Sequence, residues 1–216
     1  MPAPNRDRWV RWWHGLDASG NPDEMFGMLL AKYSERHRAY HNLDHVGDCL
    51  AEFDKARSLA KNADAIEAAI WFHDAIYDSR AKDNEEQSAE LAVKIIKSAG
   101  LSESFASTVT ALILATKHAK APDEPDAALL VDVDLSILGQ SAERFDQYER
   151  QIRREYEWVP NDAFVAGRSA ILKSFLDRSS IYTTEFFREK YESKARENLG
   201  RSLQQLASTN GAEQGK

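Results

Sequence analysis

Apolar residues recur at intervals of three and four along most of this chain, the spacing that places them on one face of an α-helix. Pro22 and the two acidic residues after it open one such stretch, as at a helix start, and Gly100 closes another. The pattern predicts helices over residues 22–37, 64–78, 84–100, 102–119, 142–159 and 184–207. The chain is therefore expected to fold as an all-α helical bundle.

One segment departs from this pattern. Residues 129–139, "LLVDVDLSILG", alternate between apolar and polar through 131–135, as a β-strand would, but no other segment offers a comparable partner strand. We interpret the segment as helical. Because there is no internal repeat and no low-complexity linker, we expect one domain over residues 21–207. We expect residues 1–20 to contain an N-terminal helix that packs on the core of this domain, and residues 208–216 to form a flexible tail.

Composition and charge exclude several classes of protein. Apolar residues make up 43% of the 216, enough for a substantial core, and the net charge of −7 comes without a run of like charges, so no nucleic-acid polymer is expected as a partner. Cys49 is the single cysteine, which excludes an intramolecular disulfide and fits a reducing compartment. No signal-like N-terminus or long apolar run is present, so we expect a soluble, cytoplasmic protein with no membrane partner.

Two histidines stand four residues apart in "YHNLDH" (40–45). If this segment is helical, His41 and His45 project from one face within about 6 Å of each other along the axis, and both can reach one bound ion or substrate. The alternative is a half-exposed polar face or histidines that cap helix ends.

A second polar pair lies inside an apolar stretch, "WFHDAIYD" (71–78). Burying the carboxylate of Asp74 beside His73 costs several kcal/mol unless it is paired or binds a cation. Asp78 stands four residues after Asp74, so on a helix a second carboxylate points the same way. A structural His–Asp hydrogen bond is the alternative.

The segment 129–139 contains the third group, Asp132 and Asp134. On a helix these carboxylates project about 200° apart, so one site takes only one of them, and the other can cap a helix. The spacing alone does not decide which. The three groups together supply two imidazoles and two carboxylates, a donor set that suits Mn²⁺, Co²⁺, Ni²⁺, Fe²⁺, Mg²⁺ or Zn²⁺. Such His/Asp sites normally keep open positions, as catalytic sites do.

The order of these residues resembles that of the HD-domain superfamily of metal-dependent phosphohydrolases, and most closely its small bacterial single-domain members. The resemblance covers roughly residues 25–200 and includes "YHNLDH", "AAIWFHDAIYD", "DNEEQSAELA", "DVDLSILG" and "IRREY". It implies His45, His73, Asp74 and Asp134 as metal ligands. Asp134 is preferred over Asp132 because "VDLS" is similar to the "ADLS" segment of the cyclic-nucleotide phosphodiesterases.

The same relatives have an H-N-x-x-H stretch, which "HNLDH" matches. This match implies that His41 donates a proton to the leaving oxygen, while Asp74 or Asp78 accepts a proton from water. Asp78 stands where guanosine-tetraphosphate hydrolases have the last residue of H-D-x-x-E-D, but Tyr77 replaces the Glu, which counts against that substrate.

Dinuclear relatives and the diiron oxygenases of this fold have more histidines between the HD pair and the last Asp, where this chain offers only His118. The resemblance therefore favours a mononuclear hydrolytic site, or a second ion held mainly by carboxylates and water. Glu85 and Glu86 are expected either to orient water or to begin the next helix as solvated residues.

Phosphate recognition requires local cations, and we expect them from Arg38, Lys117 and Arg153. The resemblance thus implies a phosphomonoesterase or pyrophosphohydrolase acting on a small phosphorylated metabolite, with a nucleotide as the favoured case. The alternatives are a metal-binding regulatory module without turnover, and an oxygenase. The predicted helices at 142–159 and 184–207 have enough apolar surface for a homodimer contact, or for packing on the core.

Overall fold

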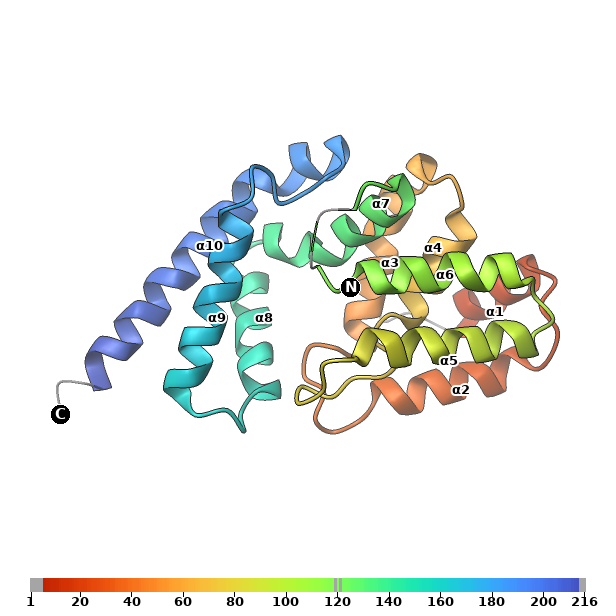
Figure 1. Ribbon diagram of the computed structural model, residues 1–216, viewed down its shortest axis with the longest axis horizontal. Helices are drawn as coiled ribbons and strands as arrows, with labels where there is room; N and C mark the ends of the chain where they lie inside the picture. The colour runs from red at the N-terminus through yellow and green to blue at the C-terminus, as the bar shows by residue number, and fades with distance from the viewer. Residues whose placement is uncertain (1–5, 119, 121, 214–216) are drawn as a thin grey trace. The chain divides into compact units, whose positions relative to one another are not determined.

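The protein is all-helical throughout the part that the computed structural model describes, which is residues 6–118, 120 and 122–213, with side chains as far as Ser208 (Figure 1). This confirms the predicted fold class. The chain divides into two compact units, Met1–Asp134 and Leu135–Lys216. No glycine- or proline-rich linker marks the division, which follows directly after a predicted metal ligand. Among the helices of the described residues, none has both the length and the apolar character needed to cross a bilayer.

The first unit is built around one buried helix, α4. Its elements are α1 (Arg6–Gly15), α2 (Pro22–Tyr33), α3 (Leu43–Ala56), the 3-10 helix η1 (Arg57–Leu59), α4 (Ala63–Phe72), α5 (Asn84–Ser98), α6 (Glu103–Ala115) and α7 (Pro125–Asp134). Helix α4 contacts α3, α5, α6 and α7, and α5 and α6 run side by side (Figure 1). Every residue from Ala65 to Phe72 is buried. The nearly all-apolar sequence of α4 thus makes it the centre of the unit.

Helix α1 joins this core through aromatic side chains. Trp9 is fully buried, with its ring 5.3 Å from that of Trp71 and 6.0 Å from that of Phe72. Its indole N–H donates to the carbonyl of Pro22 at 2.8 Å. The packing of the Trp9 ring therefore holds α1 against α4, and its hydrogen bond holds α1 against the start of α2.

Helix α4 ends at Phe72, six residues earlier than the sequence predicted. The carbonyls near its end are bound by other groups: that of Ile70 lies 3.0 Å from Nδ1 of His73, and that of Trp71 accepts the hydroxyl of Tyr33 at 3.0 Å. These contacts replace the i→i+4 bonds that a longer helix would make. The prediction of a helix over 64–78 is therefore wrong beyond residue 72.

The second unit contains η2 (Leu135–Gly139), α8 (Ala142–Glu155), α9 (Asn161–Leu176) and α10 (Glu185–Glu213). Helix α10 packs against η2 and α9, and Figure 1 shows α9 alongside it. The helical interpretation of 129–139 is confirmed by α7 and η2. Helix α9 was not predicted, and α10 includes the expected tail as far as Glu213, while residues 214–216 lie outside the described part.

Gly139 lies where η2 packs closely against α10. A Cβ built on Gly139 would stand 2.5 Å from Cβ of Tyr191, whereas one built on Gly167 in α9 meets nothing within 4 Å. We expect Gly139→Ala to destabilise the second unit by about 1–3 kcal/mol through overpacking, and Gly167→Ala to stabilise its helix by about 0.5–1 kcal/mol. Chemical denaturation of both variants checks this, and equal free energies of unfolding would contradict it.

Candidate metal centre

Two histidines on different segments of the first unit point their Nε2 atoms at each other. His73 follows α4 directly, its backbone N–H donates to Ala69 at 2.8 Å, and its ring is buried. Because the carbonyl of Ile70, 3.0 Å from Nδ1, can only accept, Nδ1 must carry the proton and Nε2 is turned inward. The Nε2 atoms of His73 and His45 lie 3.1 Å apart.

His45 is placed by the start of α3. The side chain of Asn42 caps this helix by accepting the N–H groups of Asp44 at 2.8 Å and His45 at 3.4 Å. His41 precedes the cap and is not helical. The predicted one-turn spacing is therefore wrong, but the rings of His41 and His45 still lie 6.1 Å apart between centroids.

Two carboxylates complete the cluster. An oxygen of Asp74 lies 3.1 Å from Nε2 of His73 and 3.5 Å from Nε2 of His45. At the end of α7, one oxygen of Asp134 lies 3.1 Å from Nε2 of His45 and 3.7 Å from Nε2 of His73. Asp132 is fully buried and belongs to neither group of candidate ligand atoms that lie within 4.8 Å of one another in the described residues.

These distances match the edges of a metal coordination shell. Ligand atoms about 2.1 Å from an ion lie about 3.0 Å apart at right angles and about 3.4 Å apart in a tetrahedron. The five separations that involve His45 or His73 run from 3.1 to 3.7 Å. The donor set of two nitrogens and two oxygens is also one that many divalent ions accept. These residues therefore fit a metal ion, whose identity the donor set leaves open.

The charges of the cluster stabilise one another. Burial by itself would lower the pKa of His73, but the carboxylates of Asp74 and Asp134 more than reverse this and raise it to about 9. Burial would raise the pKa of Asp74, and the three neighbouring histidines instead lower it, with His73 the largest contributor. The pKa of Asp134 is likewise lowered against the effect of burial, mainly by hydrogen bonds with His118 and His45. Both carboxylates are thus charged, whereas His73 has to lose a proton before its Nε2 can bind a cation.

His118 holds the second oxygen of Asp134. Its Nε2 lies 2.9 Å from Oδ2 of Asp134, while Oδ1 faces His45. The ring is partly exposed, and the backbone of His118 has φ of 54°. The two oxygens of Asp134 therefore have different partners, which favours one-oxygen binding to an ion.

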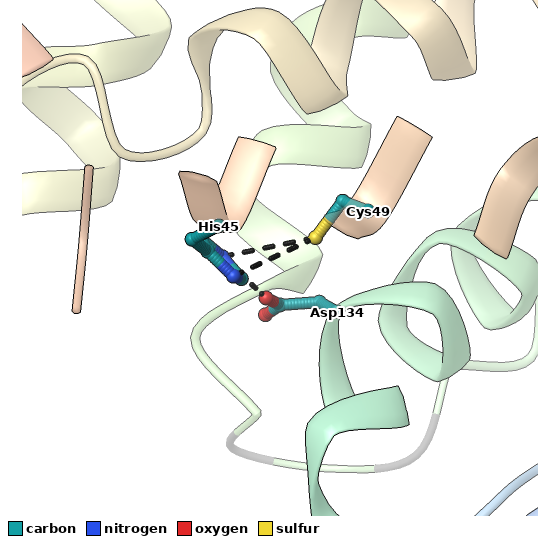
Figure 2. Close-up of side chains that lie close together, drawn as sticks. All are labelled: His45, Cys49 and Asp134. Atoms are coloured by element: carbon teal, nitrogen blue, oxygen red, sulfur yellow. Dashed lines mark hydrogen bonds and ion pairs between the residues drawn. The ribbon is translucent and has the colours of Figure 1, made fainter. Parts of the chain in front are cut away.

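Cys49, which the sequence did not mark as a site residue, has its sulfur beside His45 (Figure 2). Sγ is 3.7 Å from Nδ1 and 3.8 Å from Nε2 of that ring. A sulfur equidistant from both nitrogens lies about 4 Å or more from an ion on the Nε2 lone pair, whereas a thiolate ligand lies about 2.3 Å from zinc. Although His45, Cys49 and Asp134 are close enough together to hold an ion, we therefore treat Cys49 as a neighbour of His45. Its i+4 spacing from His45 was the available signal.

Replacing Cys49 tests this distinction. Burial, reinforced by Asp134, raises the pKa of the thiol well above its usual value, which disfavours the thiolate that a metal requires. We expect Cys49→Ala to retain the metal affinity of the natural protein. We also expect the cobalt form of the natural protein to show no thiolate-to-cobalt absorption band. Titration and the visible spectrum of the cobalt form check this; a band that disappears in Cys49→Ala would make Cys49 a ligand.

The two other predicted catalytic residues, His41 and Asp78, differ in burial and in the groups they contact. His41 is half-buried, with its ring stacked on that of Tyr77 at 4.1 Å. Asp78 is exposed: its carboxylate accepts the N–H of Arg80 at 2.9 Å, and its backbone binds the side chain of Asn84. Since α4 stops before it, the expected i+4 alignment of Asp78 with Asp74 is absent and that prediction is wrong.

The expected phosphate-binding cations have other partners. Lys117 pairs with Glu86 in the first turn of α5, next to Glu85. Arg153 belongs to the second unit, where it donates to the carbonyl of Tyr156 at 2.6 Å and its guanidinium lies 4.6 Å from the centre of the Phe164 ring. The side chain of Arg38 is fully buried and bonded within the protein.

Comparisons with protein families, with curated proteins and with solved structures found nothing that matches this chain.

Proposed function

We propose that this protein is a metal-dependent phosphohydrolase whose ion is held by His45, His73, Asp74 and Asp134. One observation carries the proposal: in a largely buried cluster built from three separate segments, the Nε2 atoms of His45 and His73 lie 3.1 Å apart, and each lies 3.1 to 3.7 Å from an oxygen of Asp74 and an oxygen of Asp134. A buried His–Asp hydrogen bond needs only two of these groups. The convergence of all four is the arrangement that a divalent cation would stabilise.

The chemistry that such an ion supplies when bound is Lewis acidity toward a phosphoryl oxygen and a water molecule. Asp74 has a second role in our proposal, as the acceptor of a proton from the attacking water. His41 donates a proton to the leaving oxygen. Its ring lies close to His45 but is not part of the ligand cluster, and it is half-buried against Tyr77, so it can reach both the site and solvent.

The substrate we propose is a small phosphorylated metabolite, with a nucleotide as the favoured case. Lys117 is the predicted cation that remains a candidate in the first unit, since its side chain is about one-third exposed and its ammonium is bonded to the half-exposed side chain of Glu86. Such a surface pair contributes little stability and can open when a phosphate competes for the lysine. Arg38 has no exposed surface to offer, so we no longer assign it to substrate.

A metal-binding regulatory module without turnover is the second candidate. The observation that favours it concerns the three cations that the sequence predicted: Arg38 is buried, and Lys117 and Arg153 already have partners. A phosphohydrolase needs positive charge around its ion to bind a multiply charged substrate. The two candidates therefore differ in whether the metal-loaded protein turns over any phosphate ester.

The deciding experiment measures metal content and hydrolysis together. The purified protein is assayed with Mn²⁺, Co²⁺, Ni²⁺ or Mg²⁺ against nucleotides, other phosphomonoesters and pyrophosphates, beside Asp74→Ala. Bound metal with turnover that Asp74→Ala loses supports the phosphohydrolase. Bound metal without turnover favours the regulatory module, and a protein that binds no metal in any of these solutions contradicts both.

A further inference from the structure

Arg38 lies between α2 and α3, and the protein uses each of its guanidinium nitrogens. Its side chain has 0% of its surface exposed. Nε donates to the carboxylate of Glu35 at 3.0 Å, Nη1 to the carbonyls of His41 at 3.0 Å and Asp74 at 2.6 Å, and Nη2 to the carbonyl of Ala75 at 3.1 Å. Three of the four acceptors are backbone carbonyls, which points to a role in shaping the backbone.

The carbonyls of Asp74 and Ala75 belong to the turn that follows α4. Past the end of a helix such carbonyls have no N–H group four residues on to bind. The planar guanidinium can bind two adjacent carbonyls with its separate nitrogens, which the single ammonium of lysine cannot do in the same way. The rings of Tyr33 and Tyr77 lie 5.2 and 5.6 Å from the guanidinium carbon and hold it in place from the side.

We infer that Arg38 is a positioning residue of the proposed metal centre: it holds the turn after α4, and with it the carboxylate of Asp74. Its third carbonyl, that of His41, ties the same turn to the segment that enters the Asn42 cap and His45. Arg38 thus joins the two segments that supply His45, His73 and Asp74. The inference rests on the proposed function, because it concerns the geometry of that metal centre.

The test compares metal affinity with folding stability. Arg38→Met removes the donors but keeps an apolar stem, Arg38→Lys keeps the charge, and Arg8→Met is the matched control. Arg8 is also a largely buried arginine of the first unit, with its side chain 20% exposed, but its pairs with Asp54 and Glu67 leave it outside the cluster. Mn²⁺ affinity is measured by calorimetry, coordination geometry by the visible spectrum of the cobalt form, and stability by thermal unfolding without metal.

We expect Arg38→Met to weaken Mn²⁺ binding about 10- to 100-fold, the loss typical of removing a group that orients a ligand, and to shift the cobalt spectrum. Arg38→Lys should fall between Arg38→Met and the natural protein. Arg8→Met should unfold at a lower temperature while retaining its affinity and spectrum. A purely structural arginine would behave like Arg8 in all three measurements.

The possible outcomes distinguish a failure of the positioning role of Arg38 from a failure of the proposed function. If the natural protein binds no metal, the proposed function fails and the inference fails with it. If the natural protein binds metal and folded Arg38→Met has the same affinity and spectrum, only the positioning role is overturned. If Arg38→Met does not fold, Arg38→Lys decides: natural affinity and spectrum overturn the role, and weaker binding with a shifted spectrum supports it.

Discussion

Replacing His73 with alanine is expected to abolish stoichiometric metal binding. Its Nε2 lies 3.1 Å from both Nε2 of His45 and a carboxylate oxygen of Asp74, so the substitution removes one of the four proposed donors. Since the loss of an orienting partner alone weakens binding about 10- to 100-fold, the loss of a ligand should weaken it about 100-fold or more. Calorimetric titration with Mn²⁺ and metal analysis after dialysis measure the effect, and hydrolysis should disappear with it.

His14→Ala is the matched control, because it makes the same chemical change at an exposed position in the last turn of α1. It should bind metal as the natural protein does. If His73→Ala folds and retains one ion per chain with unchanged affinity, His73 is not a ligand, and the cluster is a structural network of hydrogen bonds.

Replacing His41 with alanine is expected to separate two classes of substrate. A monoester leaves as a strongly basic alkoxide and needs a proton, whereas the phosphate leaving group of a pyrophosphate is stable without one. We therefore expect kcat to fall about 100- to 1000-fold for phosphomonoesters, within the range for general acids, and only about 10-fold for pyrophosphates. Metal affinity should be unchanged, because His41 stands outside the four donor atoms. Steady-state kinetics on one substrate of each class measure the contrast.

His37→Ala controls for packing, since the ring of His37 also faces Tyr77 and its Nε2 lies 2.8 Å from the Tyr77 carbonyl, yet half of its side chain is exposed. It should affect both substrate classes equally and slightly. Equal losses in His41→Ala for monoesters and pyrophosphates would mean that His41 does not protonate the leaving group.

The helical character of this protein could be predicted because it is a local property. An apolar residue every three or four positions defines the buried face of a helix before any tertiary contact is known. The ends of the helices were harder to predict. Helix α4 stops at Phe72, where the carbonyl of Trp71 accepts the hydroxyl of Tyr33, nearly forty residues earlier in the sequence. No periodicity contains that information.

The candidate site also has features that could be predicted from the sequence and others that could not. His73 and Asp74 are conspicuous in the sequence because ionisable groups are costly inside an apolar segment. The pairing of His41 and His45 was predicted from helical spacing, and their rings are close although His41 precedes the helix. Here the prediction of proximity succeeded and the reason given for it was wrong.

The all-helical fold follows from the local pattern of the sequence, which also supplies the kinds of side chain that a metal centre requires. The tertiary structure alone decided that Asp134 faces the two imidazoles, that Cys49 lies beside a ring, and that Arg38 serves the backbone. The physical reason is the separation along the chain of the residues that interact. Helical periodicity depends on neighbours within a few residues, whereas each of these roles depends on distances of a few ångströms between groups far apart in the chain, or on the exact direction of a side chain.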